Sequence, residues 1–162
     1  MKRSTKQPID PALLRDPIHL LALGFGAGLS PAAPGTVGTL LAVPIVAGVM
    51  SVGFLAHLAF AIVVCIAGVY ICGASARRLG VHDHPGIVWD EIAGYSVTML
   101  AAPLDGWWLL AGFVLFRCLD IVKPWPIREA DHSLSGGLGI MLDDIIAGLF
   151  AAAILFAVQR LL

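Results

Sequence analysis

The sequence predicts an all-α protein, a multi-pass membrane helical bundle with a short interfacial or re-entrant N-terminal helix. Of its 162 residues, 59% are hydrophobic and only 13% are charged, whereas about half of the residues of a typical soluble domain are apolar. The apolar residues form long runs, and a helix needs about 20 of them to cross the hydrocarbon core of a bilayer. These observations favour one membrane-embedded helical domain.

The N-terminal residues are polar and basic, and no apolar core with a small-residue cleavage site follows them. A cleaved signal peptide is therefore not expected. We expect residues 1–16 to form a polar cytoplasmic segment and residues 17–162 to form a single helical domain. Residues 18–29 are apolar but glycine-rich and too short to span, which favours an interfacial or re-entrant helix.

Five further segments approach the length of a membrane-crossing helix. They are residues 36–50, 53–75, 91–102, 107–121 and the run from about 140 to the end of the chain. A short turn at residues 50–52 separates the first two. The turn at residues 103–106 separates the second pair, and Trp107 and Trp108 follow it where an aromatic belt is expected.

If these segments cross the bilayer alternately, most charges lie on one of its sides. The residues on that side are 1–35, 76–90 and 117–144. All basic residues except Arg160 and all acidic residues except Asp105 lie there or at its border. The positive-inside rule makes this side the cytoplasm. The net charge of −1 and the lack of a basic stripe argue against a nucleic-acid partner, and the oligomeric state is left open.

Two segments share the pattern D-x-I-A-G, namely residues 90–94 and 144–148. Asp and Gly four residues apart lie on one helix face, and glycine there allows a neighbouring helix to approach closely. Glu91 and Asp143 adjoin these aspartates, so four carboxylates are predicted at two helix starts. Asp120 adds a fifth at the end of a third helix.

These acids have two possible interpretations. Carboxylates in a first helical turn serve as caps and favour the helix dipole, which would explain either pair alone. Two adjacent pairs beside an apolar phase are harder to explain in this way, because the second charge adds repulsion. Clustered carboxylates are relieved by a hard cation, and we expect a Mg²⁺ site formed by Asp90, Glu91, Asp143 and Asp144.

The glycine-rich stretch at residues 24–39 lacks the lysine of a nucleotide-binding P-loop and follows no strand. Its amides and hydroxyls still predict an anion cradle, with Ser30, Gly35 and Thr36 as candidate substrate-binding residues. The alternative is that these glycines only pack helices. Gly136 and Gly137 precede the helix with Asp143 and are further candidates for phosphate binding.

Arg117 and Lys123 flank Asp120 and are candidate phosphate contacts, although both could instead anchor a helix at the interface. His82 and His84 have no further imidazole at ligand spacing, which disfavours zinc. The cysteines at 65, 72 and 118 lie in or beside apolar runs and are expected to be structural, without disulfides.

Four motifs in order resemble the phosphatidylglycerophosphatase A family from about Pro17 to Leu155. They are GFGAGLSPAAPGTVGTL, GVHDHPGIVWDE, FRCLDIVKPWPIR and GGLGIMLDDIIAG. The resemblance implies Mg²⁺-dependent hydrolysis of phosphatidylglycerophosphate to phosphatidylglycerol and phosphate, the last step of phosphatidylglycerol synthesis. It also implies an all-helical protein of the bacterial inner membrane.

Carried over by motif, the candidate metal-binding and catalytic acids are Asp90, Glu91, Asp120, Asp143 and Asp144. Arg117 and Lys123 are, by the same resemblance, candidate contacts to the phosphate. We expect Asp120 to take the proton of the attacking water. The acyl chains of the lipid are expected to stay in the bilayer. The alternative is a membrane transporter or helical scaffold with an acidic ion site, for which charges near mid-helix would be expected instead.

Overall fold

The computed structural model describes residues 9–127 and 135–162, and this part of the chain contains helices and no strand. The helical fold class is therefore confirmed. The main helices are α1 (Pro17–Ala22), α2 (Pro34–Val52), α3 (Phe54–Leu79), α4 (Trp89–Thr98), α5 (Gly106–Val122) and α7 (Gly137–Leu161). Three 3₁₀ helices accompany them, η1 (Pro11–Arg15), η2 (Gly24–Leu29) and η3 (Met99–Ala101).

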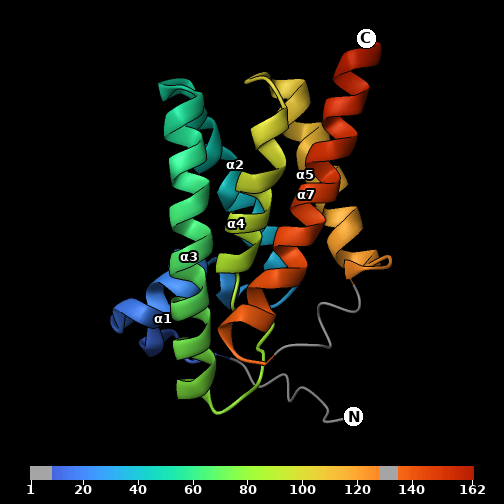
Figure 1. Cartoon of the computed structure of the whole chain (residues 1–162). Coiled ribbons are helices and arrows are strands. Elements are labelled where there is room, and N and C mark those ends of the chain that lie inside the picture. The colour runs from blue at the N-terminus through green and yellow to red at the C-terminus, as the bar shows by residue number, and fades with distance from the viewer. Residues whose placement is uncertain (1–8, 128–134) are drawn as a thin grey trace.

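The N-terminal helices α1 and η2 are short and lie at one end of the long helices (Figure 1). His19 and Ser75 form a buried hydrogen bond of 2.9 Å between Nδ1 and Oγ, which joins α1 to α3. Arg78 forms an ion pair with Asp16, and the backbone N–H of Ile18 is the main cause that lowers the pKa of Asp16. Residues 18–29 thus form two short helices, neither of which is long enough to cross a bilayer.

Among the helices that the structure describes, three are long and apolar enough to cross a membrane, namely α2, α3 and α7. The predicted crossing at 91–102 instead forms the ten-residue α4 followed by η3, and 107–121 lies within the 17-residue α5. In α4 the residues from Glu91 to Thr98 are all buried, because α2, α3, α5 and α7 pack around it. This helix is therefore the centre of the bundle (Figure 1).

The helix boundaries differ from the predicted ones by up to about one turn. The break between α2 and α3 is at Gly53, whose φ of 131° few other residues adopt. The last helix begins at Gly137, one turn before the predicted start near Ile140. The starts of α2, α4 and α7 and the ends of α3 and α5 lie toward the same end of the bundle (Figure 1). The described parts of the connections predicted to share one side, residues 9–33, 80–88 and 123–127, therefore lie at this end.

Candidate functional site

The site depends on a close contact between the parallel helices α4 and α7. A β-carbon on Gly148 would lie 2.4 Å from the carbonyl oxygen of Gly94, and one on Gly94 would lie 2.8 Å from that of Asp144. Real β-carbons essentially never approach so closely, so both positions need glycine. The close approach predicted from the repeated D-x-I-A-G pattern is confirmed, and it brings the acidic residues of the two helices together.

A cavity of about 120 Å³ lies beside this contact, at the end of the bundle where the charges gather. Its walls come from the α3–α4 connection and from α4, α5 and α7. The lining residues are Asp83, His84, Pro85, Ile87, Asp90, Glu91, Asp120, Lys123, Ile140, Asp143 and Asp144. All five predicted carboxylates therefore share one cavity, which we call the acidic cavity.

Two groups of carboxylates in this cavity are close enough to hold a cation. One group is Asp90, Glu91 and Asp144, the other is Asp120, Asp143 and Asp144, and within each group one oxygen per residue lies within 4.8 Å of the others. Asp144 belongs to both groups. All the candidate ligands are carboxylate oxygens, a donor set that suits a hard divalent cation such as Mg²⁺.

The positions of the acids within their helices separate two explanations for them. Asp90 and Glu91 lie in the first turn of α4, where a favourable dipole effect is expected. Asp143 and Asp144 are in the second turn of α7, not at its head as predicted, because the helix begins at Gly137. Neither can cap α7 there, so capping does not account for this pair.

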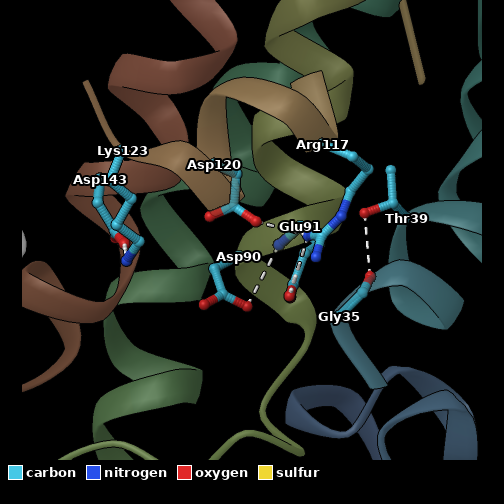
Figure 2. A network of polar contacts seen from close by, with 8 residues as sticks. All are labelled: Gly35, Thr39, Asp90, Glu91, Arg117, Asp120, Lys123 and Asp143. Carbon is cyan, nitrogen blue, oxygen red and sulfur yellow. Dashed lines mark hydrogen bonds and ion pairs between the residues drawn. The ribbon is translucent and has the colours of Figure 1, made fainter. Parts of the chain in front are cut away.

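Two cationic side chains lie among the carboxylates, each in an ion pair (Figure 2). Nη1 of Arg117 is 2.6 Å from Oδ2 of Asp120 and 3.6 Å from Oε1 of Glu91. Lys123 ends α5 in a left-handed conformation, and its Nζ is 2.5 Å from Oδ2 of Asp143. Six carboxylates line the cavity, Asp83 included, and two cations lie among them, so the described part of the cluster keeps a surplus of negative charge.

Burial, with the neighbouring carboxylates adding to it, raises the pKa of the two acids at the start of α4, which lie outside the three long apolar helices. Burial is the main cause for Glu91, whose pKa rises to about 8, and the charge of Asp144 adds to it. Burial and then the charge of Glu91 raise the pKa of Asp90. Oε2 of Glu91 and Oδ2 of Asp144 are buried and accept no hydrogen bond from the residues that the structure describes. A cation would relieve both the charge and these unsatisfied oxygens.

The predicted anion-binding glycines have different surroundings. Gly35, in the first turn of α2, lies against the acidic cluster, because a β-carbon on it would be 2.1 Å from Oε1 of Glu91 and 3.2 Å from Nη2 of Arg117 (Figure 2). Gly137 packs on α3, with its β-carbon position 1.8 Å from the carbonyl oxygen of Val69. Gly136 precedes α7 with a positive φ of 77°, and none of the described residues has an atom near its β-carbon position.

The hydroxyl residues of the glycine-rich stretch do not line the acidic cavity. Ser30 lines a neighbouring cavity instead, and its Oγ donates a hydrogen bond to the carbonyl oxygen of Ala32. Thr36 is half-buried in the first turn of α2. Phosphate binding by Ser30, Thr36, Gly136 and Gly137 stays a prediction.

Sequence reasoning did not assign Asp83 and His84, yet both line the acidic cavity. The spacing of His82 and His84 in the motif HDHP bears only on zinc binding, which it disfavours. His82 is exposed and is not among the lining residues. The backbone N–H of Gly86 donates a 3.0 Å hydrogen bond to Nδ1 of His84, which fixes the orientation of the ring. The signal that was available is the short distance in sequence from this motif to Asp90.

Comparison with known proteins gives one consistent family. A family model described as phosphatidylglycerophosphatase A matches residues 20–159. A protein of Escherichia coli with that name is 50% identical over 148 residues, which cover 88% of this chain and 84% of the relative. A protein of Haemophilus influenzae with the same name is 44% identical over 156 residues, or 94% of each chain.

A more distant relative carries a different name. A protein of Bacteroides thetaiotaomicron, provisionally named as a phosphatidylinositol-3-phosphatase, is 38% identical over 149 residues, which cover 87% of this chain and 92% of that protein. No solved structure matches the chain. The relatives thus share the name of a lipid phosphatase but differ in the headgroup that the name gives.

Proposed function

We propose that this chain, which belongs to the phosphatidylglycerophosphatase A family, hydrolyses the terminal phosphate of phosphatidylglycerophosphate and releases phosphatidylglycerol and inorganic phosphate. This would be the last step of phosphatidylglycerol synthesis. Besides the family membership, the acidic cavity supports the proposal. In it, carboxylates from α4, α5 and α7 lie together at one end of a bundle whose long helices could cross a membrane.

Magnesium is the cofactor that the cavity favours. Asp90, Glu91, Asp143 and Asp144 would hold it, and the surplus negative charge and the unsatisfied oxygens of Glu91 and Asp144 support this choice. Bound Mg²⁺ supplies a Lewis acid that neutralises phosphate charge and makes water a better nucleophile. Both groups of carboxylates contain Asp144, so this residue is the one on which the metal site depends most.

The protein side chains then have distinct tasks in phosphomonoester hydrolysis. Lys123 lines the cavity and would neutralise charge on the transferring phosphoryl group, and its present partner Asp143 holds it there. Arg117 fixes Asp120 through the 2.6 Å ion pair and would add a second cation near the phosphate. Asp120 would accept the proton of the attacking water. As the water oxygen bonds to phosphorus, the bond from phosphorus to the terminal glycerol oxygen breaks. The proton accepted by Asp120 would then pass to that glycerol oxygen, so that phosphatidylglycerol leaves as the alcohol and the phosphoryl group as inorganic phosphate.

The arrangement also supports a place in the bacterial inner membrane, with the site facing the cytoplasm. The acidic cavity lies at the end of the bundle that carries most of the charged residues, where a lipid headgroup could reach it from the bilayer surface. A transporter would need its charges along a path through the bundle. The five site carboxylates are instead gathered near one end, which favours the enzyme.

The test is release of inorganic phosphate by detergent-purified protein from three lipids in parallel, namely phosphatidylglycerophosphate, phosphatidic acid and phosphatidylinositol 3-phosphate. We expect phosphatidylglycerophosphate to have the highest kcat/KM. Preference for phosphatidylinositol 3-phosphate would assign the chain the activity in the name of its Bacteroides relative. No release from any of the three by folded protein would refute the hydrolase proposal.

A further inference from the structure

A second, larger cavity lies next to the acidic cavity. Its volume is about 470 Å³, and it shares two wall residues, His84 and Pro85, with the acidic cavity. The other lining residues are Ile9, Gly28, Leu29, Ser30, Pro31, Ala33, Pro34 and Gly86. We call it the η2 cavity, since most of this wall is the end of η2 and its connection to α2.

The η2 cavity is shaped by a backbone contact between two glycines. A β-carbon on Gly28 would lie 1.9 Å from the carbonyl oxygen of Gly86, and one on Gly86 would lie 2.7 Å from that of Gly28. This contact holds the end of η2 against the loop that carries His84. The two connections that form the cavity are therefore fixed to each other, and the cavity is part of the fold.

The volumes of the two cavities indicate that each would bind a different part of a phospholipid substrate. The 120 Å³ of the acidic cavity is below the roughly 300–1,000 Å³ of small-molecule pockets, so it suits a phosphate group with its ligands and not a complete lipid headgroup. The remaining glycerol, phosphodiester and ester groups must lie outside it. The η2 cavity adjoins it and has the volume of a small-molecule pocket, about 300–1,000 Å³.

The chemistry of the η2 cavity fits the boundary between a headgroup and its acyl chains. Leu29, Ala33 and three prolines make its wall mainly apolar, while Ser30 and His84 add polar groups. On the same short helix Phe25 is 56% exposed, and exposed aromatic or aliphatic side chains on interfacial helices are inserted into the lipid headgroup region. The cavity therefore lies beside a segment suited to the bilayer surface.

We propose that the η2 cavity binds the glycerol backbone and ester region of the phospholipid whose terminal phosphate occupies the acidic cavity. This inference rests on the proposed function, because it assigns a second part of the same substrate. The η2 cavity would then determine that the enzyme acts on a lipid and not on a small water-soluble phosphate ester. His84 and Pro85, in the shared wall, would separate the terminal phosphate from the rest of the headgroup.

The test fills the η2 cavity without touching the acidic one. Leu29→Trp adds bulk to a half-buried lining residue, and Pro31→Phe fills the same cavity from two residues further along the chain. Leu40→Trp is the matched control, because Leu40 is 60% exposed on α2 and lines neither cavity. For each purified variant we would measure kcat/KM with dioleoyl phosphatidylglycerophosphate and the inhibition constant of inorganic phosphate.

We expect both filling variants to lower kcat/KM at least about tenfold and to leave phosphate inhibition within about twofold of the wild type, since they block only the lipid part of the substrate. The control should change neither quantity. An unchanged kcat/KM in both filling variants, or a parallel loss of phosphate inhibition, would overturn the η2 cavity as a separate lipid subsite. A wild type that releases no phosphate from any lipid would instead refute the proposed function itself.

Discussion

Gly148 on α7 lies directly against the carbonyl oxygen of Gly94 on α4, which leaves no room for a β-carbon on Gly148, and a β-carbon on Gly94 would in turn clash with the carbonyl oxygen of Asp144. Each glycine is four residues after an aspartate of the acidic cavity, Asp144 and Asp90 respectively. The two helices run parallel from the same end of the bundle, so the glycine contact sets the separation of the two acidic turns (Figure 1). The geometry of the site therefore depends on residues that bear no functional group.

Replacement of Gly148 by alanine should separate α4 from α7. The added β-carbon would lie 2.4 Å from a backbone oxygen that cannot rotate away, so we expect a loss of about 1–3 kcal/mol in the free energy of unfolding. Displacement of Asp144 should also lower kcat by at least about tenfold. Thermal unfolding in detergent and initial rates of phosphate release measure the two effects.

Gly48→Ala on α2 is the control, because outside the adjacent backbone of its own helix no atom of the described residues lies within 4 Å of its β-carbon position. Alanine favours a helix over glycine by up to about 1 kcal/mol, so this variant should be as stable as the wild type or more so. Wild-type stability and rate in Gly148→Ala would show that the helices adapt to the side chain, and the account of their contact would be wrong.

Arg117 connects two carboxylates of the site. Its side chain is only 12% exposed, and it is paired with Asp120 and Glu91. Arg117→Met would leave both acids without their cation, and breaking a buried pair in this way costs about 3–5 kcal/mol. We expect a lower midpoint of thermal unfolding and a loss of turnover of about a hundredfold or more.

Arg117→Lys restores the charge but not the planar group that reaches two partners, so its activity should fall between those of Arg117→Met and the wild type. Arg15→Met, at an exposed position at the end of η1, controls for the loss of a cation elsewhere. If Arg117→Met kept the wild-type unfolding midpoint and rate, the two ion pairs would have no part in stability or catalysis.

Magnesium should stabilise the folded protein independently of turnover. A ligand that binds only the folded state stabilises it by about 2.7 kcal/mol at a concentration of 100 times Kd. We expect Mg²⁺ to raise the unfolding midpoint of the wild type in the absence of substrate, with NaCl at equal ionic strength as the control. The same midpoint with Mg²⁺ and with NaCl would argue against a metal site in the acidic cavity.

Several parts of this site could be predicted from the sequence. The repeated Asp and Gly spacing on two apolar helices predicts a close contact with acids on one side, and the structure contains both. Alternate threading of the predicted helices likewise predicts that Asp120 lies at the same end as Asp90 and Asp144. These features follow from helix periodicity and from the free-energy cost of placing charge in an apolar phase. Both can be assessed from the sequence alone.

Other parts depend on tertiary packing and were not predictable. The ten residues of α4 are enclosed by four other helices, so hydropathy alone suggested a membrane crossing there. The earlier start of α7 follows from the packing of Gly137 on the backbone of α3. The place of Asp83 and His84 in the cavity wall depends on how the loop before α4 folds back, for which the sequence has no periodic signal.

The most direct test of the central claim is the rate of phosphate release from phosphatidylglycerophosphate as a function of Mg²⁺ concentration, for the wild type, Asp144→Asn and Asp10→Asn. Asp10 is exposed and caps η1 through the backbone N–H of Ala12, which asparagine can also do, so Asp10→Asn is the matched control. We predict saturable activation by Mg²⁺ and no activity with EDTA for the wild type and the control. Asp144→Asn, which removes a carboxylate from both groups, should lose at least about a hundredfold in rate while it stays folded. Wild-type activity that persists in EDTA, or a fully active Asp144→Asn, would contradict the account.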